Sequence, residues 1–244
     1  MKSPILITCA VPDELAFFVG RLSGRKQILV GKRKLIQGQL IGVKKTLDIY
    51  ILFTGMGGEV AGEALIRILQ EIQPGTVIIS GTAGGLTKGI KTGDLFIAQN
   101  YGEEGLRAGF SNRLDLVALP GKVWRETLVT VETVTSGRDA KTMLHEKTGA
   151  GAVDMESSFL ARITGERGIP SIVIRVISDG LNDQMPVPFG EFMRADGFLS
   201  LPRLIVYVLI RPWKIPALVV FGCRVRRACD QLGVALEKLL LYEA

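Results

Sequence analysis

Short apolar segments rich in β-branched residues alternate with helical patterns, and this alternation most constrains the fold of the chain. Five such segments are candidates for buried strands: ILITC (5–9), DIYILF (48–53), TVIIS (76–80), LVTVETV (128–134) and SIVIRVI (171–177). Residues 59–72 and 156–167 instead place apolar side chains at helical spacing. Strands that alternate with helices predict an α/β fold with a central mixed, mostly parallel twisted sheet flanked by helices.

Length and composition narrow the possibilities further. A chain of 244 residues can bury a sizeable core, and we expect a single domain, 1–244, with a helical C-terminal segment at 197–244. The net charge of +6 favours an anionic partner such as phosphate or an acidic lipid surface. We expect no nucleic acid, because the sequence lacks RNA-binding aromatic motifs, zinc-finger spacing and long basic runs. Three cysteines without paired spacing, and an N-terminal apolar run too short for a signal peptide, favour the cytoplasm.

The C-terminal segment has an unusual charge pattern. Residues 197–229 contain no acidic residue, yet they carry six arginines and lysines. The longest apolar run there, LIVYVLI (204–210), is far shorter than the roughly 20 residues of a membrane-spanning helix. Two alternatives follow: these helices lie at the inner face of a membrane as a peripheral contact, or they simply pack on the sheet.

The segments that follow the strands form the candidate site, because ligands of open α/β sheets bind beyond the carboxyl ends of the strands. They are VPDEL (11–15), TGMGGE (54–59), GTAGGL (81–86), VDMES (153–157) and SDGLND (178–183). The glycine-rich GTAGGL is expected to be a loop whose backbone N–H groups could face an anion. It does not match the dinucleotide fingerprint G-x-G-x-x-G. Taken singly, each segment is equally compatible with an ordinary turn or helix cap.

The order of these segments resembles the nucleoside phosphorylase and nucleosidase superfamily, which includes purine nucleoside phosphorylases and methylthioadenosine/S-adenosylhomocysteine nucleosidases. The resemblance covers residues 5–185 and is most specific in VDMES and GTAGGL. The VDMESS form and the tail over 186–229 look most like hopanoid-associated phosphorylases, which are thought to remove adenine from an adenosylated hopanoid lipid. The resemblance implies a homo-oligomeric enzyme that cleaves a purine nucleoside, with inorganic phosphate as co-substrate and no metal or other cofactor.

The resemblance also implies roles for individual residues. Asp179 would protonate the purine near N7 as a general acid, which requires burial to favour its protonated form. Ser178 would orient Asp179. Glu156 would accept hydrogen bonds from the ribose hydroxyls, which would explain a carboxylate in an apolar setting. Met155 would pack against the sugar.

Glu14 separates two versions of the reaction. It matches the glutamate that activates water in the hydrolytic nucleosidases, so it favours hydrolysis, whereas the tail favours phosphorolysis. A solvated acid in the first turn of a helix is the plain alternative for Glu14. The pocket for phosphate or for the attacking water would be lined by Gly55, Thr82, Ala83 and Gly84.

At several positions the sequence is compatible with more than one role. Asp154 either contacts the substrate or caps the following helix. The nucleosidases stack an aromatic side chain on the base, but SGRDAKTML (136–144) contains none, which leaves Arg138 or Asp139 as candidates for base recognition. Either Asn182 or Asp183 could supply the second polar group after Asp179.

The sequence also suggests roles for several arginines and for the lone histidine. A phosphate site usually uses arginine, and the candidates are Arg21, Arg25, Arg107 and Arg138. Arg175, inside a predicted buried strand, is expected to form a structural ion pair, and His145 to lie at a surface or helix cap. A non-catalytic nucleoside-binding protein is a further alternative, and the presence of both Glu156 and Asp179 argues against it.

Overall fold

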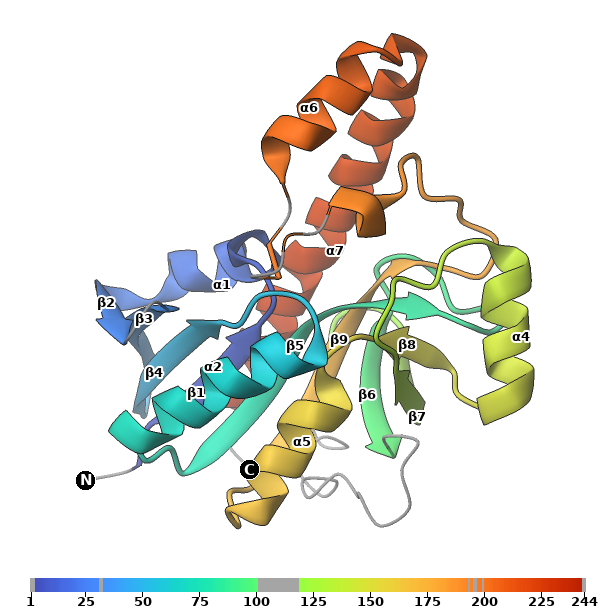
Figure 1. Cartoon of the computed structure of the whole chain (residues 1–244). Coiled ribbons are helices and arrows are strands. Elements are labelled where there is room, and N and C mark those ends of the chain that lie inside the picture. Colours follow the sequence, from blue (N-terminus) through green and yellow to red (C-terminus); the bar gives the residue numbers. More distant parts are fainter. Residues whose placement is uncertain are drawn as a thin grey trace.

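The computed structural model describes residues 3–30, 33–100, 119–192, 194, 197–198 and 200–242. Figure 1 shows a twisted central sheet with helices on both faces, and a helical hairpin that projects away from the sheet. The sheet has nine described strands in the order β2-β3-β4-β1-β5-β8-β7-β6-β9. The strands are β1 (Ile5–Cys9), β2 (Ser23–Val30), β3 (Arg33–Ile41), β4 (Thr46–Phe53), β5 (Thr76–Gly85), β6 (Leu95–Asn100), β7 (Val123–Thr130), β8 (Ala152–Asp154) and β9 (Ser171–Asp179).

The sheet is mixed, as the sequence predicts. Strands β4, β1, β5 and β9 run parallel to one another at its centre. Strand β9 also pairs with β6, so the part of the sheet made of β5, β8, β7, β6 and β9 closes on itself. The carboxyl ends of β1, β5 and β9 therefore meet at one edge, and this edge positions the candidate site.

Two layers of helices cover the sheet. On one face, α2 (Gly58–Glu71) and α5 (Ser157–Glu166) bury Leu65, Ile68 and Leu160 against the strands. On the other face, α1 (Ala16–Arg21) and the second half of α7 (Ile215–Leu241) bury Phe18 and Leu232. The predicted helices at 59–72 and 156–167 are confirmed. The remaining helical elements are the 3-10 helices η1 (Pro12–Leu15), η2 (Phe189–Phe192) and η3 (Pro212–Lys214), and the α-helices α4 (Arg138–Thr148) and α6 (Leu201–Leu209).

Some predicted boundaries are wrong. GTAGGL is not a loop over most of its length, because β5 continues to Gly85 and pairs with β9 as far as Gly84, which lies opposite Asp179. The strand predicted at 128–134 is β7, which runs over Val123–Thr130, where it can pair with β6 and β8. The surface excursion predicted at 99–125 ends in β7, and its residues 101–118 lie outside the described part of the chain.

The C-terminal segment packs on the sheet in part, as the second sequence alternative expects, and contact with a membrane surface stays a prediction. The second half of α7 packs on the sheet, whereas α6 buries none of its residues. Among the described helices, no single one is both long and apolar enough to cross a membrane. The α6 and η3–α7 segments pass that test only as a pair, and the pair is bent by 109°.

Candidate active site

Glu14 lies at the carboxyl end of β1, in η1, and it is buried rather than solvated. Its Oε1 accepts hydrogen bonds from Thr82 N and Thr82 Oγ1, both at 2.8 Å. Its Oε2 accepts hydrogen bonds from the backbone N–H groups of Ala10 and Val11, at 2.8 and 3.1 Å. The surface-acid alternative is therefore wrong. The contacts fix the carboxylate against the Thr82 segment of β5, although the two residues are far apart in sequence.

Gly81 explains why this segment is glycine-rich. Its φ is +133°, and a Cβ at this position would lie 2.5 Å from Arg175 Nη1 and 3.1 Å from both carboxylate oxygens of Glu14. Only glycine leaves room for the carboxylate and the guanidinium to approach β5 so closely. Gly81 therefore allows charged groups to pack closely against β5.

Glu156, Asp154 and Arg175 form a buried charge cluster beside Glu14. Arg175 Nη2 lies 2.5 Å from Asp154 Oδ2 and 3.5 Å from Glu156 Oε2. Glu156 Oε1 accepts a hydrogen bond from Gly57 N at 2.9 Å, which connects the cluster to the start of α2. The predicted structural ion pair of Arg175 is confirmed. Burial raises the pKa of Glu156 to about 7, with Arg175 lowering it and Asp154 raising it further.

Asp154 makes the contacts that are expected if it caps the following helix, α5. Its carboxylate accepts hydrogen bonds from Ser157 N, at 3.2 and 3.3 Å, where α5 begins, and from Thr130 Oγ1 at 2.7 Å. Together with Arg175 and the Ser157 hydroxyl, these partners occupy both carboxylate oxygens. Asp154 therefore positions Arg175 and α5, and a direct role in binding substrate stays a prediction.

Asp179 ends β9 and forms a buried ion pair with Lys141 of α4. The Lys141 ammonium also donates to the backbone carbonyls of Asp179 and Gly180, at 3.2 and 2.8 Å, and its side chain is fully buried. Ser178 Oγ lies 2.6 Å from Asp179 Oδ1 and 3.2 Å from Ala83 O, as expected for a residue that orients the carboxylate. Sequence analysis did not identify Lys141, although it lies in the 136–144 segment that lacks the aromatic residue.

The remaining predicted positions divide between the site and other places. Thr82, Gly84 and Gly55 lie at the strand ends around the cluster, and Met155 is half-buried beside Glu156. Ala83 is buried, and its carbonyl lies next to Ser178.

The other candidates make structural contacts or lie on the surface. Arg21 is paired with Glu237 at 2.8 Å on the surface, Arg25 donates to Val19 O, and Arg138 and Asp139 are exposed on α4. Arg107 lies outside the described residues. His145 contacts Ala150 O at the end of α4, at 2.8 Å, which is the predicted cap.

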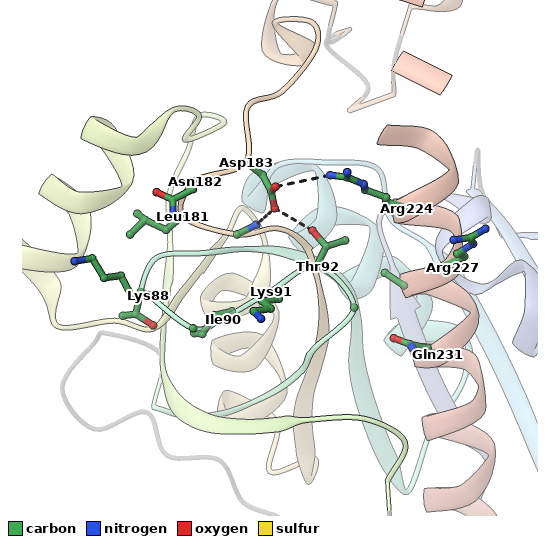
Figure 2. A pocket seen from close by; sticks show the side chains of 15 residues that line it. Lys88, Ile90, Lys91, Thr92, Leu181, Asn182, Asp183, Arg224, Arg227 and Gln231 are labelled. Carbon is green, nitrogen blue, oxygen red and sulfur yellow. Dashed lines mark hydrogen bonds and ion pairs between the residues drawn. The ribbon is translucent and has the colours of Figure 1, made fainter. Parts of the chain in front are cut away.

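Two cavities lie beyond the carboxyl end of β9. The first, of about 560 Å³, is bordered by residues 87–93, the turn at 180–183 and α7. Figure 2 shows Asp183 at its edge, where it accepts hydrogen bonds from Gly180 N (2.8 Å) and Thr92 Oγ1 (3.1 Å) and faces Arg224. The second, of about 490 Å³, extends from Ser178 to Trp213 and Phe221 of the hairpin. Of the described residues, Glu14, Glu156 and Asp179 line neither cavity.

Comparisons with known proteins agree with this architecture. A sequence profile described as the phosphorylase superfamily matches residues 4–196. The chain is similar to the methylthioadenosine/S-adenosylhomocysteine nucleosidase of Neisseria meningitidis, solved with methylthio-immucillin-A, with 16% identity, a TM-score of 0.74 and coverage of 98% of this chain and 99% of that one. It is also similar to the S-adenosylhomocysteine nucleosidase of Streptococcus pyogenes (17%, TM-score 0.71, coverage 98% and 97%) and to a futalosine hydrolase mutant of Helicobacter pylori (15%, TM-score 0.71, coverage 98% and 98%). At these identities the structural likeness is one of fold.

Proposed function

Because the chain belongs to the phosphorylase superfamily and is an enzyme of its nucleoside phosphorylase and nucleosidase type, we propose that it cleaves the N-glycosidic bond of a purine nucleoside with water as the attacking group. The observation that supports this proposal best is Glu14. Its carboxylate is buried at the carboxyl end of β1 and is oriented by Thr82 and two backbone N–H groups. A positioned carboxylate of this kind can take a proton from water during attack.

The chemistry divides between two ends of the site. Loss of the purine leaves positive charge on the ribose and negative charge on the departing base. At one end, the hydroxyl of Thr82 can rotate away from Glu14 Oε1, and that lone pair can then accept a proton from the water. At the other end, the proton for the base comes from the Lys141–Asp179 pair. Glu156 accepts hydrogen bonds from the ribose hydroxyls between them.

Charge is the reason to prefer water over phosphate. The described residues of the site include four buried carboxylates, those of Glu14, Asp154, Glu156 and Asp179. They include two buried cations, Arg175 and Lys141, and both are already in ion pairs. The guanidinium of Arg175 is committed to Asp154, Ser157 Oγ and Ser80 O. A phosphate dianion would add charge repulsion here, and among the described residues of the site no arginine outside these ion pairs offsets it. Phosphorolysis, implied by the resemblance of the tail, stays a prediction.

Phosphate dependence tests the proposal. We expect adenine release from adenosine and methylthioadenosine to proceed equally with and without inorganic phosphate, giving the free sugar rather than the sugar 1-phosphate. Glu14→Gln should lower this rate at least about 100-fold, because it removes the base. The matched control is Asp13→Asn, which changes an exposed neighbouring carboxylate and should leave the rate unchanged. Release that requires phosphate, with a sugar 1-phosphate seen by phosphorus NMR, would instead establish a phosphorylase.

The raised pKa of Glu156 predicts how nucleoside binding depends on pH. An ionised carboxylate accepts hydrogen bonds from ribose hydroxyls more strongly than a protonated carboxyl does, and the carboxyl of Glu156 ionises as the pH rises through about 7. Affinity for a non-cleavable adenosine analogue should therefore increase between about pH 6 and pH 8, with release of a proton on binding below pH 7. Calorimetry in two buffers of different ionisation enthalpy measures that proton. Glu156→Gln should bind more weakly and lose both the pH dependence and the proton release; a variant that keeps them would assign them to another group.

A further inference from the structure

The hairpin formed by α6, η3 and the first half of α7 carries most of the large apolar side chains that are exposed in the described part of the protein. Fifteen large apolar side chains are exposed among the described residues, and nine of them lie between positions 201 and 220. Leu209 is 70% exposed and Trp213 is 71% exposed. In Figure 1 this part of the chain projects beyond the sheet and its covering helices, so the protein itself does not bury it. An exposed apolar patch of this extent usually indicates an interaction surface.

Positive charges accompany the apolar surface. Arg224, Arg226 and Arg227 are exposed on α7, roughly one helical turn beyond the last exposed valine, Val220. Among the described residues, Arg224 is the only one of these three that forms an ion pair, with Asp183 at 3.9 Å. The sequence holds no carboxylate between Gly197 and Cys229. An apolar tip followed by a cationic collar is the arrangement that an anionic lipid surface attracts.

Aromatic contacts hold the hairpin in place relative to the active-site edge. Phe221 of α7 stacks on Phe189 with 5.7 Å between ring centroids, and Tyr207 of α6 meets the edge of Phe192 at 5.1 Å. Lys214, at the turn, donates to Pro186 O at 2.8 Å. Both phenylalanines and Pro186 belong to the segment that leaves Asp179. The hairpin is thus a positioned element and not a free tail.

We propose that this hairpin docks the protein on the surface of an anionic phospholipid bilayer, with Leu209 and Trp213 entering the interface and the arginines of α7 contacting lipid headgroups. Tryptophan prefers this interface because its ring is apolar and its N–H is polar. A second copy of the chain fits the hairpin less well. In a symmetric dimer the same surface of each copy would meet, and because this surface is cationic and carries no carboxylate, the two copies would repel each other.

The docked orientation gives the second cavity a use, and this step rests on the proposed function. That cavity runs from Ser178, next to Asp179, to Trp213 at the hairpin turn. Its outer wall includes Ala217, Val220 and Phe221. A nucleoside with an apolar chain at its 5′ end could therefore keep the chain at the bilayer while its other end lies at Ser178, the neighbour of Asp179. A nucleoside that carries an apolar lipid chain at its 5′ end is the matching substrate class.

Vesicle binding of the full-length protein tests the docking proposal. We expect flotation with vesicles of phosphatidylcholine and phosphatidylglycerol, weaker flotation with phosphatidylcholine alone, and loss at high salt. Ile205→Glu with Leu209→Glu should abolish flotation, because both side chains are exposed and now carry charge. Arg226→Gln with Arg227→Gln should weaken it about fivefold for each charge removed. The matched control is Leu29→Glu with Val43→Glu, which changes exposed apolar residues elsewhere and should float like the unchanged protein.

The outcomes separate docking from other occupants of the surface and from failure of the enzyme proposal. Absence of flotation, or equal loss in the control, would overturn docking. A smaller oligomer by light scattering in the Ile205→Glu, Leu209→Glu variant, without vesicle binding by the unchanged protein, would assign the surface to a second copy. The same variant should still release adenine from soluble adenosine, so a lack of activity in every form would contradict the proposed function and leave the vesicle result intact.

Discussion

Replacing Asp179 with asparagine is expected to reduce kcat for adenine release by about 100- to 10,000-fold, the usual contribution of a general acid. Asparagine has the same shape and still accepts a hydrogen bond from Ser178 and Lys141, but its amide cannot pass a proton to the base. Binding of a non-cleavable adenosine analogue should change only a few-fold. Steady-state kinetics together with analogue titration measure the two effects separately.

A substrate that needs no acid sharpens this test. The leaving group of p-nitrophenyl riboside is p-nitrophenolate, a stabilised anion that departs without being protonated. The Asp179→Asn variant should therefore cleave this substrate at a rate close to that of the unchanged enzyme. Asp183→Asn is the control for disturbance of the turn, because Asp183 accepts hydrogen bonds from Gly180 N and Thr92. Equal losses on both substrates would mean that Asp179 is structural, and equal turnover on adenosine would remove it from the mechanism.

The central strands could be predicted because burial on both faces leaves an unmistakable pattern. ILITC at 5–9 is β1, with the predicted bounds, and the segment predicted at 171–177 is the buried part of β9. The pair β2 and β3 was not predicted. Strand β2 is mostly exposed and its sequence, SGRKQILV, has neither a continuous apolar run nor strict alternation. Such strands are defined by their pairing partner, which local sequence does not contain.

The same limitation explains the incorrect boundary at GTAGGL. Glycine and threonine usually indicate a turn, yet β9 continues alongside this segment and supplies its hydrogen-bonding partners as far as Gly84. The glycines are required by side chains that approach from elsewhere, Arg175 and Glu14 at Gly81. Tertiary contact, rather than local preference, decided the conformation.

The candidate site was predictable where a residue follows a strand and not where its partner lies far along the chain. Glu14, Glu156 and Asp179 come directly after strands or at their ends, so the topology indicates them. Lys141 comes from α4, 38 residues before Asp179. A lysine within a helix is ordinarily a solvent-facing residue. Only the fold shows that this one is fully buried and paired with the proposed acid.

Replacing Lys141 with methionine is expected to lower the free energy of unfolding by about 3–5 kcal/mol, because Asp179 would keep a buried charge without its partner. The double variant Lys141→Met, Asp179→Asn should recover most of that loss, since neither charge remains. Urea denaturation of the single variants and the double variant measures the coupling. Additive losses would mean that the two side chains do not interact as the structure describes.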